Sequence, residues 1–148
     1  MNWLDLPPVW LVGTLCVGFG LDHLWPGLGF DWALTKGFGT GLIAVAFLFM
    51  LGAALMFLHG KTSVVPRREP SAFLQHGLYR YSRNPIYLAD ALLLAGCLMR
   101  WDVLPALILV PLFMRVLTKR FIEDEEAGLR AKFGPEFEDW ASRVRRWI

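Results

Sequence analysis

Residues 38–58 read FGTGLIAVAFLFMLGAALMFL and contain no charged side chain. An α-helix rises about 1.5 Å per residue, so about 20 such residues cross a hydrocarbon core about 30 Å thick. A surface helix of a soluble protein keeps one polar face, whereas this segment is apolar on every side. The stretch therefore predicts a membrane-spanning helix.

Three further apolar runs predict additional spans. One precedes this segment, at residues 8–25, and two follow it, at 84–100 and 103–118. The last two runs are short for a full crossing, and the brief connection between them makes them an antiparallel hairpin. We expect an all-α, polytopic membrane protein with about four transmembrane helices, in which residues 1–148 form a single domain.

The composition supports this class and excludes several others. Hydrophobic residues make up 55% of the 148 and charged residues 19%, against about 25% charged in a soluble domain. A net charge of +2 does not indicate a nucleic-acid partner. Cys16 and Cys97 lie in apolar runs, which argues against a disulfide framework. His23, His59 and His76 are too scattered to predict a metal site.

The basic residues predict the orientation in the membrane. They are concentrated in the loop 59–83 and in the C-terminal segment 119–148, and Lys and Arg are retained on the cytoplasmic side. We expect both segments and both termini in the cytoplasm, with the spans in a bacterial inner membrane. A helix after Gly134 carries apolar residues on one side, which predicts a helix lying on the membrane surface. Those residues are Phe137, Trp140, Val144 and Trp147.

Two clusters of polar residues flank the predicted hairpin. The stretch 77–87 reads GLYRYSRNPIY and precedes the third span, and the acidic run 123–126 follows the fourth. Since the two spans form a hairpin, their cytoplasmic ends are neighbours, and we expect the clusters to meet there. Each cluster also has a purely structural interpretation: arginines that set topology, tyrosines at the interface and a solvated acidic helix face.

In combination, the two clusters resemble the isoprenylcysteine carboxyl methyltransferase family, to which phospholipid methyltransferases are related. The shared pattern is G-x-Y-x-x-x-R-[HN]-P-x-Y, followed by E-E-x-x-L and F-G, and the similarity covers the chain from about Thr62 to Ile148. Members are integral membrane enzymes that use S-adenosylmethionine. The resemblance implies cofactor contacts from residues of both clusters and from the preceding segment, Ser71 to Leu74. These residues are Leu74, Gly77, Tyr79, Arg83, Asn84, Pro85, Ile86, Tyr87, Glu125 and Glu126.

Three further residues bear on the acceptor. A basic residue before the glutamates orients the acceptor in carboxyl-methylating members, and Arg120 is the candidate for that role here. Asn84 stands where the commonest pattern has His, and an amide does not titrate. Asp90 stands near a position where many members have Gly. An acidic residue inside a span is costly, which makes Asp90 a candidate substrate residue.

The resemblance implies methyl transfer from S-adenosylmethionine to a lipophilic acceptor, a prenylcysteine-like carboxylate or another small lipid, at the cytoplasmic membrane face. Tyrosine rings suit the adenine and the sulfonium, and a glutamate suits the ribose hydroxyls. The alternatives are N-methylation of a phospholipid headgroup, an NADPH-dependent reductase of the sterol-reductase type, and a non-catalytic membrane scaffold or carrier. Whether O, N or S is methylated, and the oligomeric state, stay open.

Overall fold

The structure is a computed structural model that describes residues 5–24, 29–60 and 73–148, and these residues contain no β-strand. The all-α prediction is confirmed. In chain order the elements are α1 (Pro7–Leu24), α2 (Ala33–Gly60), the 3₁₀ turn η1 (Gly77–Arg80), α3 (Pro85–Arg100), the 3₁₀ segment η2 (Leu104–Ile108), α4 (Leu109–Leu117), the π-helical segment η3 (Thr118–Ile122), α5 (Glu123–Phe133) and α6 (Pro135–Arg143).

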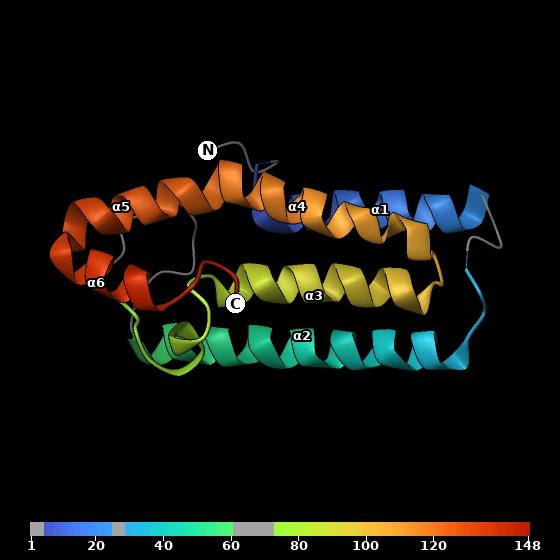
Figure 1. Ribbon diagram of the computed structural model, residues 1–148, viewed down its shortest axis with the longest axis horizontal. Helices are drawn as coiled ribbons and strands as arrows, with labels where there is room; N and C mark the ends of the chain where they lie inside the picture. Colours follow the sequence, from blue (N-terminus) through green and yellow to red (C-terminus); the bar gives the residue numbers. More distant parts are fainter. Residues whose placement is uncertain (1–4, 25–28, 61–72) are drawn as a thin grey trace.

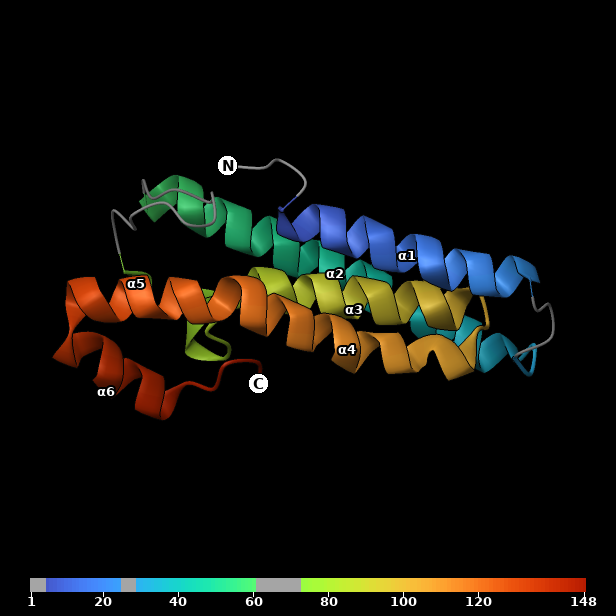
Figure 2. The ribbon, with the colours of Figure 1, turned by 90° about the horizontal axis from the view of Figure 1, so that it is seen from above.

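Four helices run side by side along the long axis of the molecule, and α3 lies in their centre (Figure 1). It contacts α1, α2 and α4. The end of α1, the start of α2 and the α3–α4 connection lie at one end of the molecule, whereas α5 and α6 extend from the other (Figure 2). Because α4, η3 and α5 follow one another without a break, they form one long helical run.

The α3–α4 hairpin depends on a sharp turn. Pro85 occupies the first turn of α3, where its fixed φ suits the helix. At the other end, the Val103 N–H donates to the Leu98 carbonyl at 2.9 Å. Asp102 adopts a φ of 64°, in the left-handed region that non-glycine residues rarely occupy. This turn reverses the chain, and the predicted hairpin is observed.

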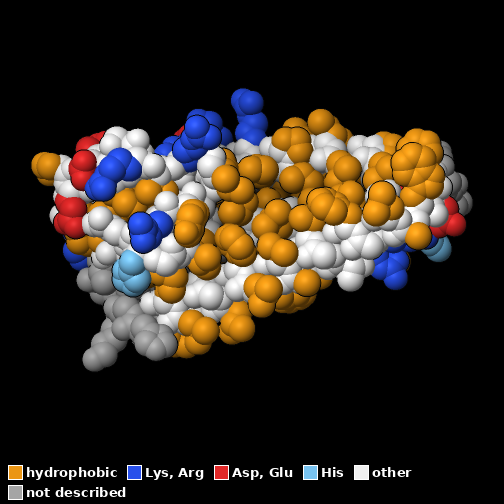
Figure 3. Space-filling view, turned by 60° about the horizontal axis from the view of Figure 1, so that its bottom comes forward, with side chains coloured by type: hydrophobic (Ala, Val, Ile, Leu, Met, Phe, Trp, Pro, Cys, Tyr) orange, Lys and Arg blue, Asp and Glu red, His pale blue; other side chains and the backbone are white. Residues whose placement is uncertain are grey.

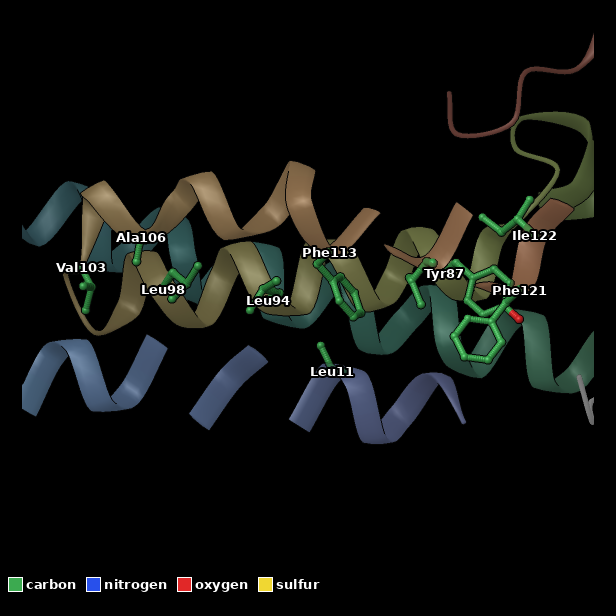
Figure 4. Packing of buried hydrophobic residues seen from close by; sticks show 10 residues of the cluster. Leu11, Tyr87, Leu94, Leu98, Val103, Ala106, Phe113, Phe121 and Ile122 are labelled. Atoms are coloured by element: carbon green, nitrogen blue, oxygen red, sulfur yellow. The ribbon is translucent and has the colours of Figure 1, made fainter. Parts of the chain in front are cut away.

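A row of buried apolar side chains joins α3 to α1 and to the long helical run (Figure 4). Leu94 and Leu98 of α3 are fully buried, and Phe113 of α4 is 3% exposed. Burying a side chain of this size contributes about 1.5–3 kcal/mol. The row continues to Phe121 and Ile122 (Figure 4), so it reaches from the hairpin turn to the start of α5.

The contact between α2 and α3 depends on two glycines. A Cβ at Gly96 would lie 2.8 Å from the Gly39 carbonyl oxygen, and one at Gly39 would lie 2.7 Å from the Gly96 carbonyl oxygen. The two backbones therefore touch, which small residues allow in closely packed helix pairs. A larger side chain at either position would force the helices apart.

The outer helix α2 exposes large apolar side chains. Phe47, Leu48 and Leu51 are 58%, 67% and 57% exposed. On the face drawn in Figure 3, apolar side chains cover the middle of the molecule, and charged side chains lie mostly toward its two ends. This surface is not that of an ordinary soluble domain, where large contiguous apolar patches are rare.

Within the described ranges, one helical stretch is long and apolar enough to cross a membrane, Ala33–Met56 in α2. Of its most apolar window, 17% is buried inside the chain. The other predicted spans are helical, but α1 has 18 residues, α3 has 16 and α4 has nine. The helices and the hairpin are therefore observed, whereas a polytopic membrane topology with four crossings is not established.

The bounds of the second predicted span differ from the structure. The second predicted span began at residue 38, but α2 begins at Ala33 and continues to Gly60, so it occupies part of each neighbouring loop. Residues 61–72 of the predicted cytoplasmic loop 59–83, Ser71 among them, lie outside the described residues.

The predicted membrane-surface helix needs a correction. Its apolar side is covered by the chain itself, because Phe137 and Trp140 are 0% and 4% exposed. They pack against Phe73 and Tyr79, and Phe73 meets the Trp140 ring edge-on with centroids 5.0 Å apart. The helix also ends at Arg143, so Val144 continues as extended chain. The prediction that these side chains share one apolar side is confirmed for Phe137 and Trp140, but other residues of the protein cover that side.

Candidate functional site

The two predicted clusters meet where α3 begins beside α5. The Tyr87 hydroxyl donates to Oε1 of Glu125 at 2.6 Å, across 38 residues of sequence. Tyr87 is 7% exposed and lies against Phe121, with ring centroids 6.5 Å apart. A short hydrogen bond to a carboxylate is one of the stronger kinds. It fixes the start of α3 against the start of α5.

Tyr79, on the η1 turn, lies near the same carboxylate. Burial and, to a smaller extent, the negative charge of Glu125 raise the pKa of the Tyr79 hydroxyl well above its usual range. The hydroxyl therefore stays protonated at neutral pH and remains a hydrogen-bond donor. Two tyrosines from different elements thus surround Glu125.

Asp90 follows Tyr87 by three residues, which places both on one face of α3. It is 5% exposed and lies close enough to the Tyr87 hydroxyl to interact with it electrostatically. Within the described part of the chain its carboxylate has no hydrogen-bond or ion-pair partner. We call Tyr79, Tyr87, Asp90 and Glu125 the tyrosine–carboxylate cluster.

Glu126 has different partners from Glu125. Arg146 donates to it through Nε at 3.0 Å and through Nη2 at 2.6 Å, and Nη2 of Arg83 lies 3.5 Å from Oε1. The Glu126 side chain is 8% exposed. The hydrogen bond to Glu126 raises the pKa of the Arg146 guanidinium. The structure thus places Glu126, a predicted cofactor contact, in an ion pair with the C-terminal tail.

The motif residues before α3 also hold this tail. Asn84 Nδ2 donates to the Arg146 carbonyl at 3.0 Å, and the Arg83 N–H donates to the Arg145 carbonyl at 3.0 Å. Asn84 occupies the N-cap of α3, but its side chain makes no capping hydrogen bond. The Ser82 hydroxyl also donates to the Arg146 carbonyl, at 3.4 Å. We call Ser82, Arg83, Asn84, Glu126 and Arg146 the tail clamp. In the sequence, the only indication of these tail contacts is the closing RRWI, which is part of the family resemblance.

Arg120 is directed toward α1. Its Nε and Nη2 lie 3.1 Å and 3.0 Å from Oδ1 of Asp5, and its guanidinium lies 5.0 Å from the centroid of the Trp10 ring. The π-helical segment η3 contains Arg120 and shifts the register of the helix before Glu125. Such segments are frequent at functional sites, and this one was not predicted from the sequence.

The remaining predicted residues shape the backbone of the site. Leu74 is 7% exposed, Pro85 is buried and Ile86 is partly buried. Gly77 has a φ of 59°, and a Cβ there would lie 2.8 Å from the Met56 side chain. Only glycine fits both the left-handed conformation and the close approach to α2. None of the four has a polar side chain to offer to a ligand.

An apolar groove lies between α1 and α4, with a volume of about 470 Å³. At one end its wall includes Trp10, whose ring lies under Arg120. Phe113 belongs both to the groove and to the core row that continues to Tyr87. The lining residues are Val9, Trp10, Gly13, Thr14, Val17, Leu109, Leu112, Phe113 and Val116.

A family model described as a protein of unknown function (DUF1295) matches residues 26–144. The chain belongs to the DUF1295 family. The match covers both motif clusters, and DUF1295 is related to membrane proteins of the steroid 5-alpha reductase and methyltransferase type. Comparisons with curated proteins and with solved structures found no match.

Proposed function

We propose that this protein is a membrane-embedded, S-adenosylmethionine-dependent methyltransferase that acts on a lipophilic acceptor. The proposal is supported above all by the 2.6 Å hydrogen bond between Tyr87 and Glu125. It joins the two motifs that resemble the isoprenylcysteine carboxyl methyltransferase family. Methyl transfer needs mainly positioning and exclusion of water, since the transferred carbon is already activated.

The surface supports a place for the four helices within a membrane. Val12 and Val17 of α1, Phe47 of α2 and Leu112 of α4 are all more than half exposed. Lipid would cover these side chains, whereas water would make them an aggregation hazard. In this arrangement α3 is the central span, and the tyrosine–carboxylate cluster lies at the end of the bundle from which α5 extends.

The residues of the site fit the cofactor. S-adenosylmethionine would supply a methyl group bound to a positively charged sulfur. Tyr79 and Tyr87 offer rings for the adenine and for the sulfonium, a contact that contributes about 0.5–2 kcal/mol. Glu125 offers a carboxylate for the ribose hydroxyls. Nε of Arg83 is buried and has no partner in the described chain, so it is a suitable donor to the cofactor carboxylate.

The groove between α1 and α4 offers a route for the acceptor. Its walls are almost entirely apolar, and both helices expose apolar residues to their surroundings. A lipophilic chain would enter from the bilayer and lie against Phe113, in the same row as Tyr87. The reacting end would then approach the cofactor from the membrane side.

Cofactor binding by the purified protein in detergent tests the proposal. We expect S-adenosylhomocysteine to bind, as measured by calorimetry, and Glu125→Gln to weaken binding. The matched control is Glu123→Gln, an acid of the same run that pairs with Lys119 instead. If the wild-type protein binds neither S-adenosylmethionine nor S-adenosylhomocysteine, the proposal is wrong.

A reductase is the second candidate, because the DUF1295 family is related to both classes of membrane protein. It predicts that NADPH binds and displaces S-adenosylhomocysteine or binds in its place. A scaffold or carrier predicts that neither cofactor binds. A competition experiment with both cofactors therefore separates the three functions.

A further inference from the structure

We infer that the groove between α1 and α4 binds a single apolar chain of a lipid with an anionic end group, and that Gly13 determines which chains fit. The inference rests on the proposed methyl transfer only where it names this lipid as the acceptor. It depends on the walls and volume of the groove, on the space beside Gly13 and on the charge at one end of the groove.

The groove is suited to one hydrocarbon chain. Its volume of about 470 Å³ lies in the range of small-molecule sites. A partner helix is about 10–12 Å wide with its side chains, which is too wide to enter a space of this size. The polar groups of its walls already donate within the protein, because the Thr14 hydroxyl donates to the Trp10 carbonyl at 2.8 Å and Trp10 Nε1 donates to Asp5 at 3.4 Å. A ligand that fills the groove is therefore apolar.

Gly13 leaves the open space in the wall that α1 forms. A Cβ at Gly13 would meet no atom within 4 Å, although the residue lines the groove. Val9 and Val17 lie one turn before it and one turn after it on the same side of α1, and both carry branched side chains. A larger side chain at position 13 would therefore fill the groove at its midpoint without displacing other residues of the protein. Gly13 thus sets the width available to a bound chain.

An unpaired cation lies near one end of the groove. This end is marked by Trp10, whose ring centroid lies 5.0 Å from the Arg120 guanidinium. Arg115 precedes Val116 of the groove wall and follows Leu112 by three residues, which places it on the same side of α4 as Leu112. Arg115 is exposed and has no hydrogen-bond or ion-pair partner among the described residues. A carboxylate or a phosphate is the complement of such a guanidinium.

The direction of the groove suits the proposed reaction. Because α1 and α4 run in opposite directions (Figure 1), Val17 and Leu109 form the end far from Arg115. That end lies toward the hairpin turn, in the apolar middle of the bundle. A bound chain would therefore point its apolar end into the bundle and its anionic end toward α5, where Glu125 meets Tyr87.

Quenching of Trp10 fluorescence by brominated dodecanoates tests the inference in phosphatidylcholine nanodiscs. The Trp10 signal is the difference between each protein and the same protein with Trp10→Phe. We expect 2-bromododecanoate, which is brominated beside the carboxylate, to quench Trp10 saturably and more strongly than 12-bromododecanoate, which is brominated at the other end. Stronger quenching by the 12-bromo compound, or quenching that does not saturate, would overturn the inference.

Variants of two glycines of α1 test the role of Gly13. Gly13→Leu should weaken the binding of 2-bromododecanoate at least about tenfold, because its side chain overfills the groove, and Gly13→Ala should weaken it less. Gly20→Leu is the matched control, since a Cβ there also meets no atom within 4 Å and Gly20 does not line the groove. Leucine favours helices more than glycine does, so both leucine variants should melt no lower than wild type. Unchanged binding in Gly13→Leu, or equal losses in both leucine variants, would refute the role of Gly13.

Displacement of 2-bromododecanoate identifies the end group. Dodecanoate and dodecyl phosphate should displace it at least about tenfold better than dodecyltrimethylammonium, and the stronger of the two anions distinguishes a carboxylate lipid from a phosphate lipid. Arg115→Gln should reduce this preference by a few-fold, as expected for an exposed ion pair. Equal displacement by the ammonium compound would overturn the inference.

These measurements need no cofactor, so they are independent of the proposed function. Quenching that depends on Gly13, without any binding of S-adenosylhomocysteine, would refute the methyltransferase and leave the groove as a lipid site. Binding of S-adenosylhomocysteine without such quenching would refute only this inference.

Discussion

The tail clamp and the tyrosine–carboxylate cluster use neighbouring residues of the same two motifs, but they differ in how their charges are satisfied. In the clamp, Glu126 is paired with Arg83 and Arg146. In the cluster, Glu125 meets the hydroxyl of Tyr87, and Asp90 accepts no hydrogen bond from the described chain. Paired charges hold a structure together, whereas unpaired buried ones are available to a ligand.

This difference shows that adjacency in a motif does not imply a shared role. Glu125 and Glu126 are consecutive, and the resemblance assigns both to the cofactor. On a helix, consecutive side chains point about 100° apart. One therefore meets α3 and the other meets the C-terminal tail. The comparison predicts that variants of the clamp change stability, whereas variants of the cluster change binding.

The largest effect is expected from Glu126→Ala. It leaves two guanidinium groups without their carboxylate, which costs about 3–5 kcal/mol in a fully buried pair. Because Arg146 is 31% exposed, we expect about 2–3 kcal/mol here. Chemical denaturation followed by tryptophan fluorescence measures the change. Combined Glu126→Gln and Arg146→Gln should cost less than the sum of the two single changes, and strict additivity would contradict the ion pair.

A smaller effect, on binding alone, is expected from Glu125→Gln. The amide keeps the shape but loses the charge, so the affinity for S-adenosylhomocysteine should fall about 10- to 100-fold, or about 1.4–2.8 kcal/mol. The free energy of unfolding should change by less than about 1 kcal/mol, because Glu125 is only partly buried and water replaces part of the contact. A loss of stability as large as that of Glu126→Ala would remove the distinction between the two glutamates.

Asn84→Ala should destabilise the protein by about 1 kcal/mol, the usual net contribution of one hydrogen bond. The variant loses the bond from Nδ2 to the Arg146 carbonyl and frees part of the tail. Limited proteolysis of the C-terminus measures the loosening. Tyr81→Ala is the matched control, because that side chain is 73% exposed and its loss should change stability by no more than about 0.5 kcal/mol.

The smallest effect is expected from Tyr87→Phe. The ring stays in the core row, and only the 2.6 Å hydrogen bond to Glu125 is lost. We expect cofactor affinity to fall by a few-fold, about 0.5–1 kcal/mol, and the free energy of unfolding to fall by no more than about 1 kcal/mol, because Glu125 is only partly buried and water replaces part of the bond. Tyr87→Ala should be more severe in both measurements, because it also removes the ring. Equal effects of the two variants would mean that the ring contributes nothing.

Much of the architecture was predictable from local patterns. Apolar runs predicted helices near their observed positions, and the short connection before Val103 required a hairpin. The hairpin in turn brought Tyr87 toward Glu125, because the ends of two adjacent antiparallel helices opposite their turn must be neighbours.

Contacts between distant segments were not predictable in this way. An amphipathic pattern shows that Phe137 and Trp140 share a face, but it does not show whether lipid or protein covers that face. Likewise, a basic residue before the glutamates suggested a role at the acceptor, whereas the π-helical segment directs Arg120 to Asp5, which precedes α1.

The sequence by itself determined that this chain is helical, apolar in its middle and polar at the motif-bearing end, because hydropathy and periodicity act between neighbouring residues. Only the tertiary structure decided the roles within the motifs. Arg146 of the C-terminal tail pairs with Glu126, whereas Asp90 has no such partner among the described residues. The physical reason is that a carboxylate's role depends on which charges the fold brings near it, and that placement is a property of packing.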